Sequence, residues 1–313
     1  MEEILNISVS PHIKTKTSTT RIMLDVIVAL VPAMTAAIIL FGIRAFIIIA
    51  DTVFAAVLSE YLCRRVMKRD NTIHDLSAVV TGILLALNLP VGISPAIAAF
   101  GAVIAIAVVK QMFGGIGNNF VNPALAARII LMSSFPKPMT TWAVPFYNKR
   151  GEVDAVTAAT PFVIHNSGGD VPLKDLFLGT TGGCMGETCA LALIIGFIYL
   201  LIRRIISPVI PLTYIGTAAL MAFIWHENIL FHILSGGLLI SAIFMASDYT
   251  TTPINTKGKF IFGIGCGILT FLIRYYGNLP EGVSFSVLIM NILVPLIERA
   301  TAPRFDKKEH SNA

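Results

Sequence analysis

A short polar segment near the middle of the chain carries the residues best suited to chemistry. Asp154, Thr157 and Thr160 stand three residues apart in the run Asp-Ala-Val-Thr-Ala-Ala-Thr-Pro. Pro161 biases Thr160 toward an extended backbone, which would present its hydroxyl away from a helix. The small Ala159 and its alanine neighbour would let a bulky group approach the backbone. From these residues alone, a threonine-rich turn without chemistry is the more economical interpretation.

A second polar segment follows about twenty residues later, in the run Gly179-Thr180-Thr181-Gly182-Gly183. Consecutive backbone amides in such a run can surround an anion. A flexible hinge into the next apolar stretch explains the same residues equally well. Cys184 and Cys189 lie just beyond, without CxxC spacing or a nearby histidine pair. Small residues at a helix entrance are favoured over a disulfide or a metal contact, and no metal site is expected.

The composition of the chain indicates a membrane protein. Of its 313 residues, 55% are hydrophobic and only 13% are charged, whereas roughly 25% are charged in soluble domains. The charges fall between apolar runs of about 17–22 residues, the length of helix that crosses a hydrocarbon core of roughly 30 Å. Because lipid offers no hydrogen-bond partners, such runs must be helical. The net charge of +5 belongs to the connecting loops, so nucleic-acid binding is not expected.

Ten spans are predicted from these runs. Their approximate ranges are 22–41, 45–62, 74–90, 95–112, 121–134, 188–206, 209–225, 229–246, 260–276 and 283–299. The third ends on Asn88-Leu89-Pro90 and the fifth opens on a polar run that ends with Asn122-Pro123. Short or interrupted spans of this kind often flank a site within the membrane.

Lysine and arginine set the expected orientation. Placing the N-terminus in the cytoplasm puts sixteen of the 23 basic residues on that side. The chain then divides into a cytoplasmic segment 1–21, a membrane half 22–134, an extracytoplasmic loop 135–187, a second membrane half 188–299 and a cytoplasmic tail 300–313. We therefore expect a multi-pass protein of the inner (cytoplasmic) membrane, with both termini cytoplasmic.

The predicted fold is an all-α polytopic membrane protein of about ten transmembrane helices with one extracytoplasmic loop insertion. Since each half holds five spans, any structural repeat between them must be inverted in the membrane. Gly82 in the third span and Gly236-Gly237 in the eighth give a faint sequence echo between the halves. Two inverted five-helix halves are accordingly expected.

Several polar residues inside or beside the apolar runs are further candidates, because a charge at mid-membrane costs roughly 2.5–3.5 kcal/mol on insertion scales. The intramembrane candidates are Asp25, Asn122, Arg128 and Asp248, and the same runs also hold Asp51, Glu60 and Lys110. For Asp25, a side chain that simply reaches the membrane interface is favoured. For the others, a structural ion pair or a helix cap explains the residue as well as a functional role does.

The chain resembles the D subunit of Rnf complexes, which are membrane-bound ferredoxin:NAD oxidoreductases that couple electron flow to ion movement. It is more distantly similar to the B subunit of the sodium-translocating NADH:quinone reductase. The resemblance covers nearly the whole length, and no single stretch would decide it alone. The stretches that carry it are 10–14, 19–26, 117–124, 245–248 and 277–285.

The resemblance implies a covalent cofactor. In that family flavin mononucleotide (FMN) is attached through its phosphate to a threonine, in the pattern Asp, two residues, Ser or Thr, usually Gly, then Ala and Thr. Asp154, Thr157, Ala159 and Thr160 match this pattern, while Ala158 stands where glycine is commoner. Thr160 is therefore the expected attachment site, and a flavin transferase acting on the outer face is the expected maturation partner. That face agrees with the side of the loop inferred from charge.

The same resemblance implies the wider role of the chain. A second, non-covalent flavin (riboflavin or FMN) is expected in the membrane part, at residues that the resemblance does not identify. From its own chemistry, Arg128 could pair with a carboxylate or contact the ribityl chain or phosphate of a flavin. The expected partners are the other membrane subunits, the flavin subunit and the iron–sulfur subunits of the complex. The chain would then be part of a translocase that moves Na⁺ or H⁺, with its catalytic residues unknown and NAD and ferredoxin bound by other subunits. A cofactor-free transporter of five plus five inverted spans, or a membrane scaffold, is the alternative.

Overall fold

The computed structural model describes residues 18–146, 157–158, 160–167, 169, 171–277 and 282–302, and these residues are mostly helical. The first half contains α1 (Thr19–Phe41), α2 (Ile43–Val66), the 3₁₀ turn η1 (Ile73–Asp75), α3 (Ser77–Leu87), α4 (Pro95–Val103), the π-helix η2 (Ile104–Gln111) and α5 (Pro123–Ser134). The second half contains α9 (Ala190–Ile202), α10 (Val209–Ile224), α11 (Ile229–Leu234), α12 (Leu238–Ile240), the π-helix η4 (Ser241–Met245), α13 (Thr256–Tyr276) and α14 (Val283–Thr301).

Four of these helices, α1, α2, α13 and α14, are long and apolar enough to cross a membrane as single helices. Five shorter apolar helical stretches, α3, α4 with η2, α5, α9 and α10, correspond to five further expected spans. A multi-pass membrane protein is thus confirmed. These helical stretches are shorter than the apolar runs that predicted them, because several of the expected spans include turn residues at their ends.

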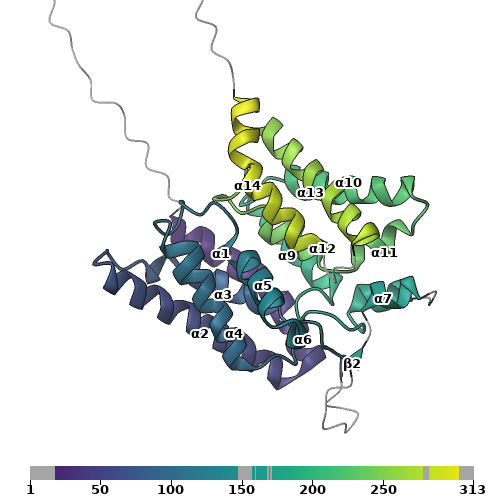
Figure 1. Ribbon diagram of the computed structural model, residues 1–313, viewed down its shortest axis with the longest axis horizontal. Helices are drawn as coiled ribbons and strands as arrows, with labels where there is room; N and C mark the ends of the chain where they lie inside the picture. Colours follow the sequence, from purple (N-terminus) through teal and green to yellow (C-terminus); the bar gives the residue numbers. More distant parts are fainter. Residues whose placement is uncertain are drawn as a thin grey trace, which may run out of the picture.

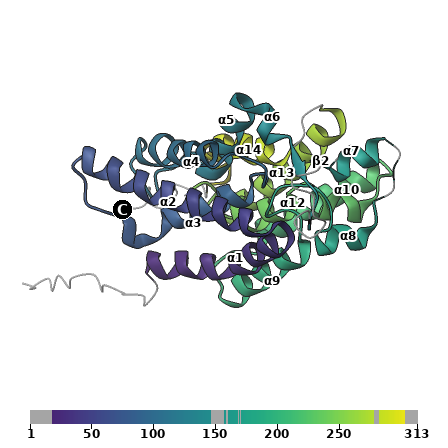
Figure 2. The same ribbon diagram turned by 90° about the horizontal axis from the view of Figure 1, so that it is seen from below.

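The two halves of the chain pack side by side. Figure 1 shows the purple-to-teal helices of the first half beside the green-to-yellow helices of the second. Helix α1 packs along α9, as Figure 2 also shows, and α5 contacts α14. One apolar cluster runs through both halves, with members such as Leu30 and Leu85 in the first and Ile240 and Phe262 in the second. The halves therefore share one core.

The hairpin between α1 and α2 depends on a single glycine. Gly42 ends the first helix and begins the second with φ +74°, a left-handed conformation that glycine adopts without a steric penalty. Its amide donates to the carbonyl of Ile38. Helix α2 continues to Val66, four residues beyond the expected end at 62, because the arginine-rich turn after the apolar run remains helical.

The expected span 229–246 is not one helix, and this corrects the sequence-based expectation. It consists of α11, a break at Ser235-Gly236-Gly237, and α12 leading into η4. Both glycines adopt positive φ values, +65° and +71°, and this conformation ends the helix. The first half is interrupted as well, because α3 ends at Leu87 and α4 passes into the π-helix η2. Such π-helical turns are often found at functional sites.

The loop insertion forms small elements on one end of the bundle. It includes α6 (Pro136–Met139), α7 (Pro161–Asn166), α8 (Leu173–Leu178) and the strands β1 (Trp142–Ala143) and β2 (Thr157–Ala158). The strands pair antiparallel, with Trp142 opposite Ala158 and Ala143 opposite Thr157. Figure 1 shows α7 close to α11 of the second half.

Contacts between helix ends show which of them lie at the same end of the bundle. At one end, the amide of Phe146 in the insertion donates to Leu40 at the end of α1 (2.7 Å), and Arg44 in α2 donates to the carbonyl of Gly92 (3.1 Å). At the other, the start of α1 is bonded to the end of α9 through Asp25 and Arg203. The start of α1 and the insertion therefore lie at opposite ends of this part of the bundle.

Candidate functional site

Thr160 lies at the start of α7 with its side chain partly exposed. Its backbone is extended, at φ −67° and ψ 156°, as Pro161 predicts, and its Oγ1 accepts a hydrogen bond from the amide of Val163 at 3.4 Å. Thr157, the other hydroxyl of the motif, lies in β2 opposite Ala143. Asp154 and Ala159 lie outside the described residues. Thr160 is thus a helix-capping hydroxyl at the edge of the loop insertion.

A pocket opens beside Thr160, between the insertion and the second membrane half. It encloses about 410 Å³, its opening included. Its walls come from four segments that are far apart in the sequence. The lining residues are Trp142, Thr160, Pro161, Phe162, Leu176, Thr181, Gly182, Glu187, Thr188, Leu234, Ser235 and Gly236. The two polar loop segments singled out in the sequence therefore meet here, a juxtaposition that their spacing could not reveal.

The glycine-rich segment folds around a carboxylate of this chain. Glu187 Oε1 accepts a hydrogen bond from the amide of Cys184 at 2.8 Å, and a Cβ built on Gly183 would stand 2.6 Å from the same oxygen. The amide that directly follows this segment is therefore taken by Glu187 and not by a bound anion. The four cysteines of the chain are all free thiols, so Cys184 and Cys189 form no disulfide.

Aromatic contacts hold α7 against the second half. The ring of Phe162 packs edge-on against Phe231, with 5.0 Å between centroids, and the guanidinium of Arg274 lies 4.8 Å from the Phe162 centroid. His165 stacks on Phe231 at 4.5 Å, and its Nε2 lies 3.2 Å from a carboxylate oxygen of Glu227. These contacts position the helix that Thr160 begins.

Arg274 also supplies hydrogen bonds to the backbone at the break between α11 and α12. It donates to the carbonyls of His232 at 2.8 Å, Ser235 at 3.0 Å and Gly236 at 2.9 Å. These carbonyls belong to the last turn of α11 and the break that follows, where helical bonds are missing. Arg274 therefore supports both the broken span and the Phe162 wall of the pocket.

Beneath the pocket, the loop before α9 enters the helical core. The amides of Met185 and Gly186 donate to the carbonyls of Leu89 (3.2 Å) and Leu87 (2.7 Å) at the end of α3. Cys184 Sγ lies 3.2 Å from the carbonyl of Asn88. The interrupted end of α3 is thus satisfied by a segment about a hundred residues later, which sequence analysis did not predict.

Arg128 is almost completely buried next to this loop. Its guanidinium donates to the side chain of Asn88 and approaches Cys184 Sγ at 3.0 Å. Asn88 Nδ2 in turn donates to the carbonyl of Leu84 at 2.7 Å and lies 3.6 Å from Met245 Sδ in η4. Arg128 is therefore part of a polar cluster that joins α3, α5 and the loop before α9.

Asn122 caps α5, as one of its two sequence interpretations holds. Its Oδ1 accepts from the amides of Ala124 at 3.0 Å and Leu125 at 3.3 Å. Its Nδ2 donates to the carbonyl of Met245 across the boundary between the halves at 3.4 Å. The same side chain lines a large interior cavity.

This cavity lies between the two halves, toward the end of the bundle that carries the start of α1, and encloses about 780 Å³, its opening included. Apolar side chains make up most of its wall. Its polar lining residues are Ser77, Thr81, Lys110, Asn119, Asn122, Ser247, Asp248 and Thr250. Asp248 accepts a hydrogen bond from the hydroxyl of Thr250 at 2.9 Å within a turn, and no helix begins at this residue. An apolar wall with a few polar groups is typical of small-molecule pockets.

Asp25 has a charged and a polar partner near the start of α1, which the favoured sequence interpretation did not include. Only 7% of it is exposed, and its carboxylate lies 3.1 Å from Arg203 and 2.9 Å from the hydroxyl of Tyr199. It is a structural ion pair between α1 and α9. The side chain is not among the residues that line the cavity.

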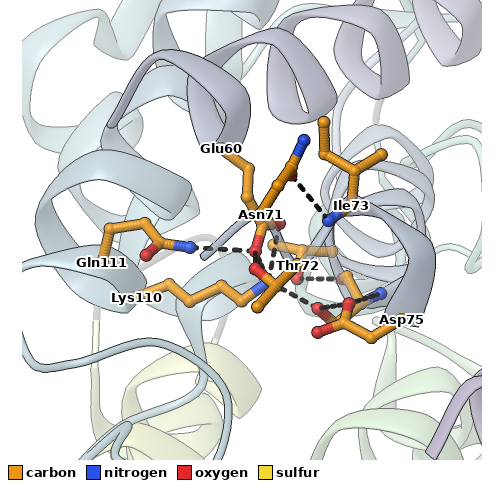
Figure 3. Close-up of polar contacts among 9 residues, drawn as sticks. Glu60, Asn71, Thr72, Ile73, Asp75, Lys110 and Gln111 are labelled. Carbon is orange, nitrogen blue, oxygen red and sulfur yellow. Dashed lines mark hydrogen bonds and ion pairs between the residues drawn. The ribbon is translucent and has the colours of Figure 1, made fainter. Parts of the chain in front are cut away.

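A buried ion pair adjoins the cavity. Lys110 Nζ in η2 lies 2.9 Å from Glu60 Oε2 in α2, and Gln111 and Thr72 donate to Glu60 Oε1 (Figure 3). Lys110 also donates to Ser77 Oγ at 2.6 Å. The sequence marked Glu60 and Lys110 separately but did not pair them. Opposite charges in two neighbouring apolar runs were the available signal.

Comparison with known proteins shows similarity over nearly the whole chain. Residues 6–306 match the family model described as the NQR2, RnfD, RnfE family. The chain is 46% identical over 306 residues to the D subunit of the Na(+)-translocating ferredoxin:NAD(+) oxidoreductase complex of Acetobacterium woodii, covering 96% of this chain and 94% of that protein. It is 41% identical over 320 residues to the D subunit of the proton-translocating ferredoxin:NAD(+) oxidoreductase complex of Clostridium ljungdahlii, covering 96% of each. Identity to the D subunit of the ion-translocating oxidoreductase complex of Stutzerimonas stutzeri is 38%, covering 92% of each chain.

Proposed function

Because the chain belongs to the NQR2, RnfD, RnfE family, we propose that it is the D-type membrane component of an ion-translocating ferredoxin:NAD(+) oxidoreductase complex. It acts as an enzyme only together with the other subunits of that complex. Its relatives include subunits of both a Na(+)-translocating and a proton-translocating complex, and either ion is compatible with this proposal.

Thr160 is the proposed attachment site for FMN, through a phosphoester to its Oγ1. The supporting observation is the position of this hydroxyl, which is partly exposed, extended and next to a pocket whose nearby walls include glycine and threonine. Bound there, the flavin would supply one- and two-electron redox chemistry. Phe162 and Arg274 would hold the attachment site in place.

Attachment is tested by producing the chain together with a flavin transferase and examining the denatured polypeptide in a gel under ultraviolet light. The wild-type chain should fluoresce and Thr160→Ala should be dark, because the tether survives denaturation. Thr157→Ala need not abolish the signal, since Thr157 belongs to the motif but is not the proposed acceptor. Thr180→Ala is the control outside the motif and should remain fluorescent. A fluorescent Thr160→Ala chain would exclude Thr160 as the acceptor. A colourless wild-type chain would favour a cofactor-free transporter.

The interior cavity is the proposed place of a second, non-covalent flavin. The supporting observation is its lining, because a mainly apolar wall with a few polar groups suits an isoalloxazine ring. Asn119 Oδ1 is buried and has no hydrogen-bond partner among the described residues, so it is available for a ring N–H. Asn119→Leu should lower the amount of flavin released by denaturation, while the covalent fluorescence at Thr160 stays unchanged.

The proposed arrangement in the membrane is ten spans in two inverted halves, with both termini cytoplasmic in the inner membrane. It is supported by the opposite ends at which Asp25 and the insertion lie and by the interrupted third span of each half. Reporter fusions test it: a periplasmically active reporter should work within the insertion and fail at either terminus.

A further inference from the structure

A groove runs between α2 and the helical stretch formed by α4 and η2, which pack side by side (Figure 1). Its lining residues come from α2, between Asp51 and Cys63, and from α4 and η2, between Ala99 and Ala107. The groove is open along one side and has a volume of about 440 Å³. Because none of the described residues of the second half lines it, the packing of the two halves leaves this groove uncovered.

The groove is elongated along the helices that form it. On α2 the lining residues recur three or four positions apart, which places them on one face of the helix. The stretch from Asp51 to Cys63 is about 18 Å long, since each helical residue adds about 1.5 Å. That length is more than half of a hydrocarbon core of roughly 30 Å. A third helix lying along α2 and α4 would therefore fill the groove.

Small side chains make up much of the groove wall. They are Ala55 and Ser59 in α2, Ala99 in α4 and Ala107 in η2. Ser59 Oγ donates to the carbonyl of Ala55 at 2.6 Å, so its hydroxyl is directed at its own helix. Membrane helices pack most closely where such small residues face one another, because the backbones can then approach. This face of the first half is therefore suited to contact with another helix.

Asp51 is the one ionisable carboxyl group in the groove wall. It makes no hydrogen bond and no ion pair with any of the described residues, and its Oδ2 is shielded from solvent. It lies about 12 Å along α2 from Ile43, well inside the span. Ionisable residues at such depth almost always face protein and find a partner there. Lipid tails offer no hydrogen-bond donor, whereas a side chain of another polypeptide does.

We propose that this groove binds a membrane-spanning helix of another subunit, which packs against Ala99 and Ala107 and directs a hydrogen-bond donor at Asp51. The donor is a hydroxyl, amide or basic side chain on that helix. The inference rests on the proposed function, because it requires that the chain works inside a membrane complex. Asp51 is a positioning residue in this role, and neither a cofactor nor the transported ion contacts it.

The proposal is tested in membranes that contain the assembled complex, with a photo-crosslinking benzoyl-phenylalanine placed at Leu58. Leu58 lines the groove and is 43% exposed. Ultraviolet light should join it to a membrane span of another subunit of the complex, identified by mass spectrometry of the purified adduct. Asp51→Leu should lower the adduct yield about three-fold, the effect of one hydrogen bond between membrane helices. Ala99→Leu should lower it at least as much, because the larger side chain fills the groove.

Ala50→Leu is the matched control for Ala99→Leu. Ala50 is an exposed alanine of α2 that does not line the groove, so the adduct yield of this variant should equal that of the wild type. Unfolding midpoints of the isolated variant chains show whether each still folds. If Ala99→Leu lowers the midpoint, Asp51→Leu decides.

The outcomes separate the groove from the proposed function. A chain that purifies with other subunits, but crosslinks from Leu58 only to lipid or to a second copy of itself, would overturn the groove proposal alone. Equal adduct yields in the wild type, Asp51→Leu and Ala99→Leu would overturn it as well. A chain that purifies without any other subunit would overturn both proposals.

Discussion

Lys110 Nζ lies 2.9 Å from Glu60 Oε2, although fifty residues separate the two in the chain. Neither side chain is more than 2% exposed. The pair joins α2 to η2 where the wall of the interior cavity begins. Removing one member of a buried ion pair leaves the other charge uncompensated, whereas removing both leaves none.

The first prediction concerns this pair. Glu60→Gln and Lys110→Met should each destabilise the folded chain by about 3–5 kcal/mol, and the double variant should lose less than the sum of the two. Thermal unfolding of all four proteins in detergent measures this coupling. Additive losses would show that the two side chains do not depend on one another.

The second prediction concerns the attachment of α7. Phe162→Ala removes the ring between Phe231 and Arg274, contacts that contribute about 1–2 kcal/mol. Limited proteolysis of the insertion should become several-fold faster, because local opening requires less free energy. Val163→Ala is the control: Val163 is 58% exposed, and its cleavage rate should equal that of the wild type.

The third prediction concerns the cap of α5. Asn122→Ala removes two bonds to the first turn and one bond to the second half. Loss of the cap should lower the free energy of unfolding by about 1 kcal/mol. Loss of the bond to the carbonyl of Met245 in the second half should lower it further. Ser133→Ala on the exposed face of the same helix should change the unfolding midpoint little. Equal midpoints for both variants would contradict a structural role for Asn122.

The fourth prediction concerns Asp51 in α2. Its Oδ2 is buried and has no hydrogen-bond partner among the described residues, and it faces a groove lined by Ala55, Ser59 and Ala99. An unpaired carboxylate within a span is costly, so Asp51→Leu should leave the isolated chain as stable as the wild type or more stable. A lower unfolding midpoint than that of Ala50→Leu would reveal a stabilising role within this chain.

The spans and the backbone conformation of Thr160 can be predicted from short stretches of the sequence. Apolar runs predict spans because lipid forces each segment to satisfy its own backbone bonds. Pro161 predicts the extended backbone of Thr160 for a similarly local reason. The break at Gly236-Gly237 is harder to predict from the sequence. From the sequence, these glycines are interpreted as an echo of Gly82 and not as the end of a helix.

Side-chain partners across spans require the folded chain. The sequence favours a position near the membrane interface for Asp25, but the packing of α1 along α9 brings Arg203 to it. Nothing in the sequence around Arg128 indicates that Asn88 and Cys184 surround it. A periodicity of 3.6 residues orients a side chain on its own helix, whereas its neighbours depend on how helices cross.

The amino-acid sequence by itself therefore determined that the chain is a many-span membrane protein with one polar insertion and a distinctive threonine, because hydropathy, charge bias and proline restriction act over short distances. Only the tertiary structure decided that Thr160, Glu187 and Thr188 share one pocket and that Glu60 meets Lys110. Those relationships depend on long-range packing, which brings together residues whose order in the chain carries no record of their proximity.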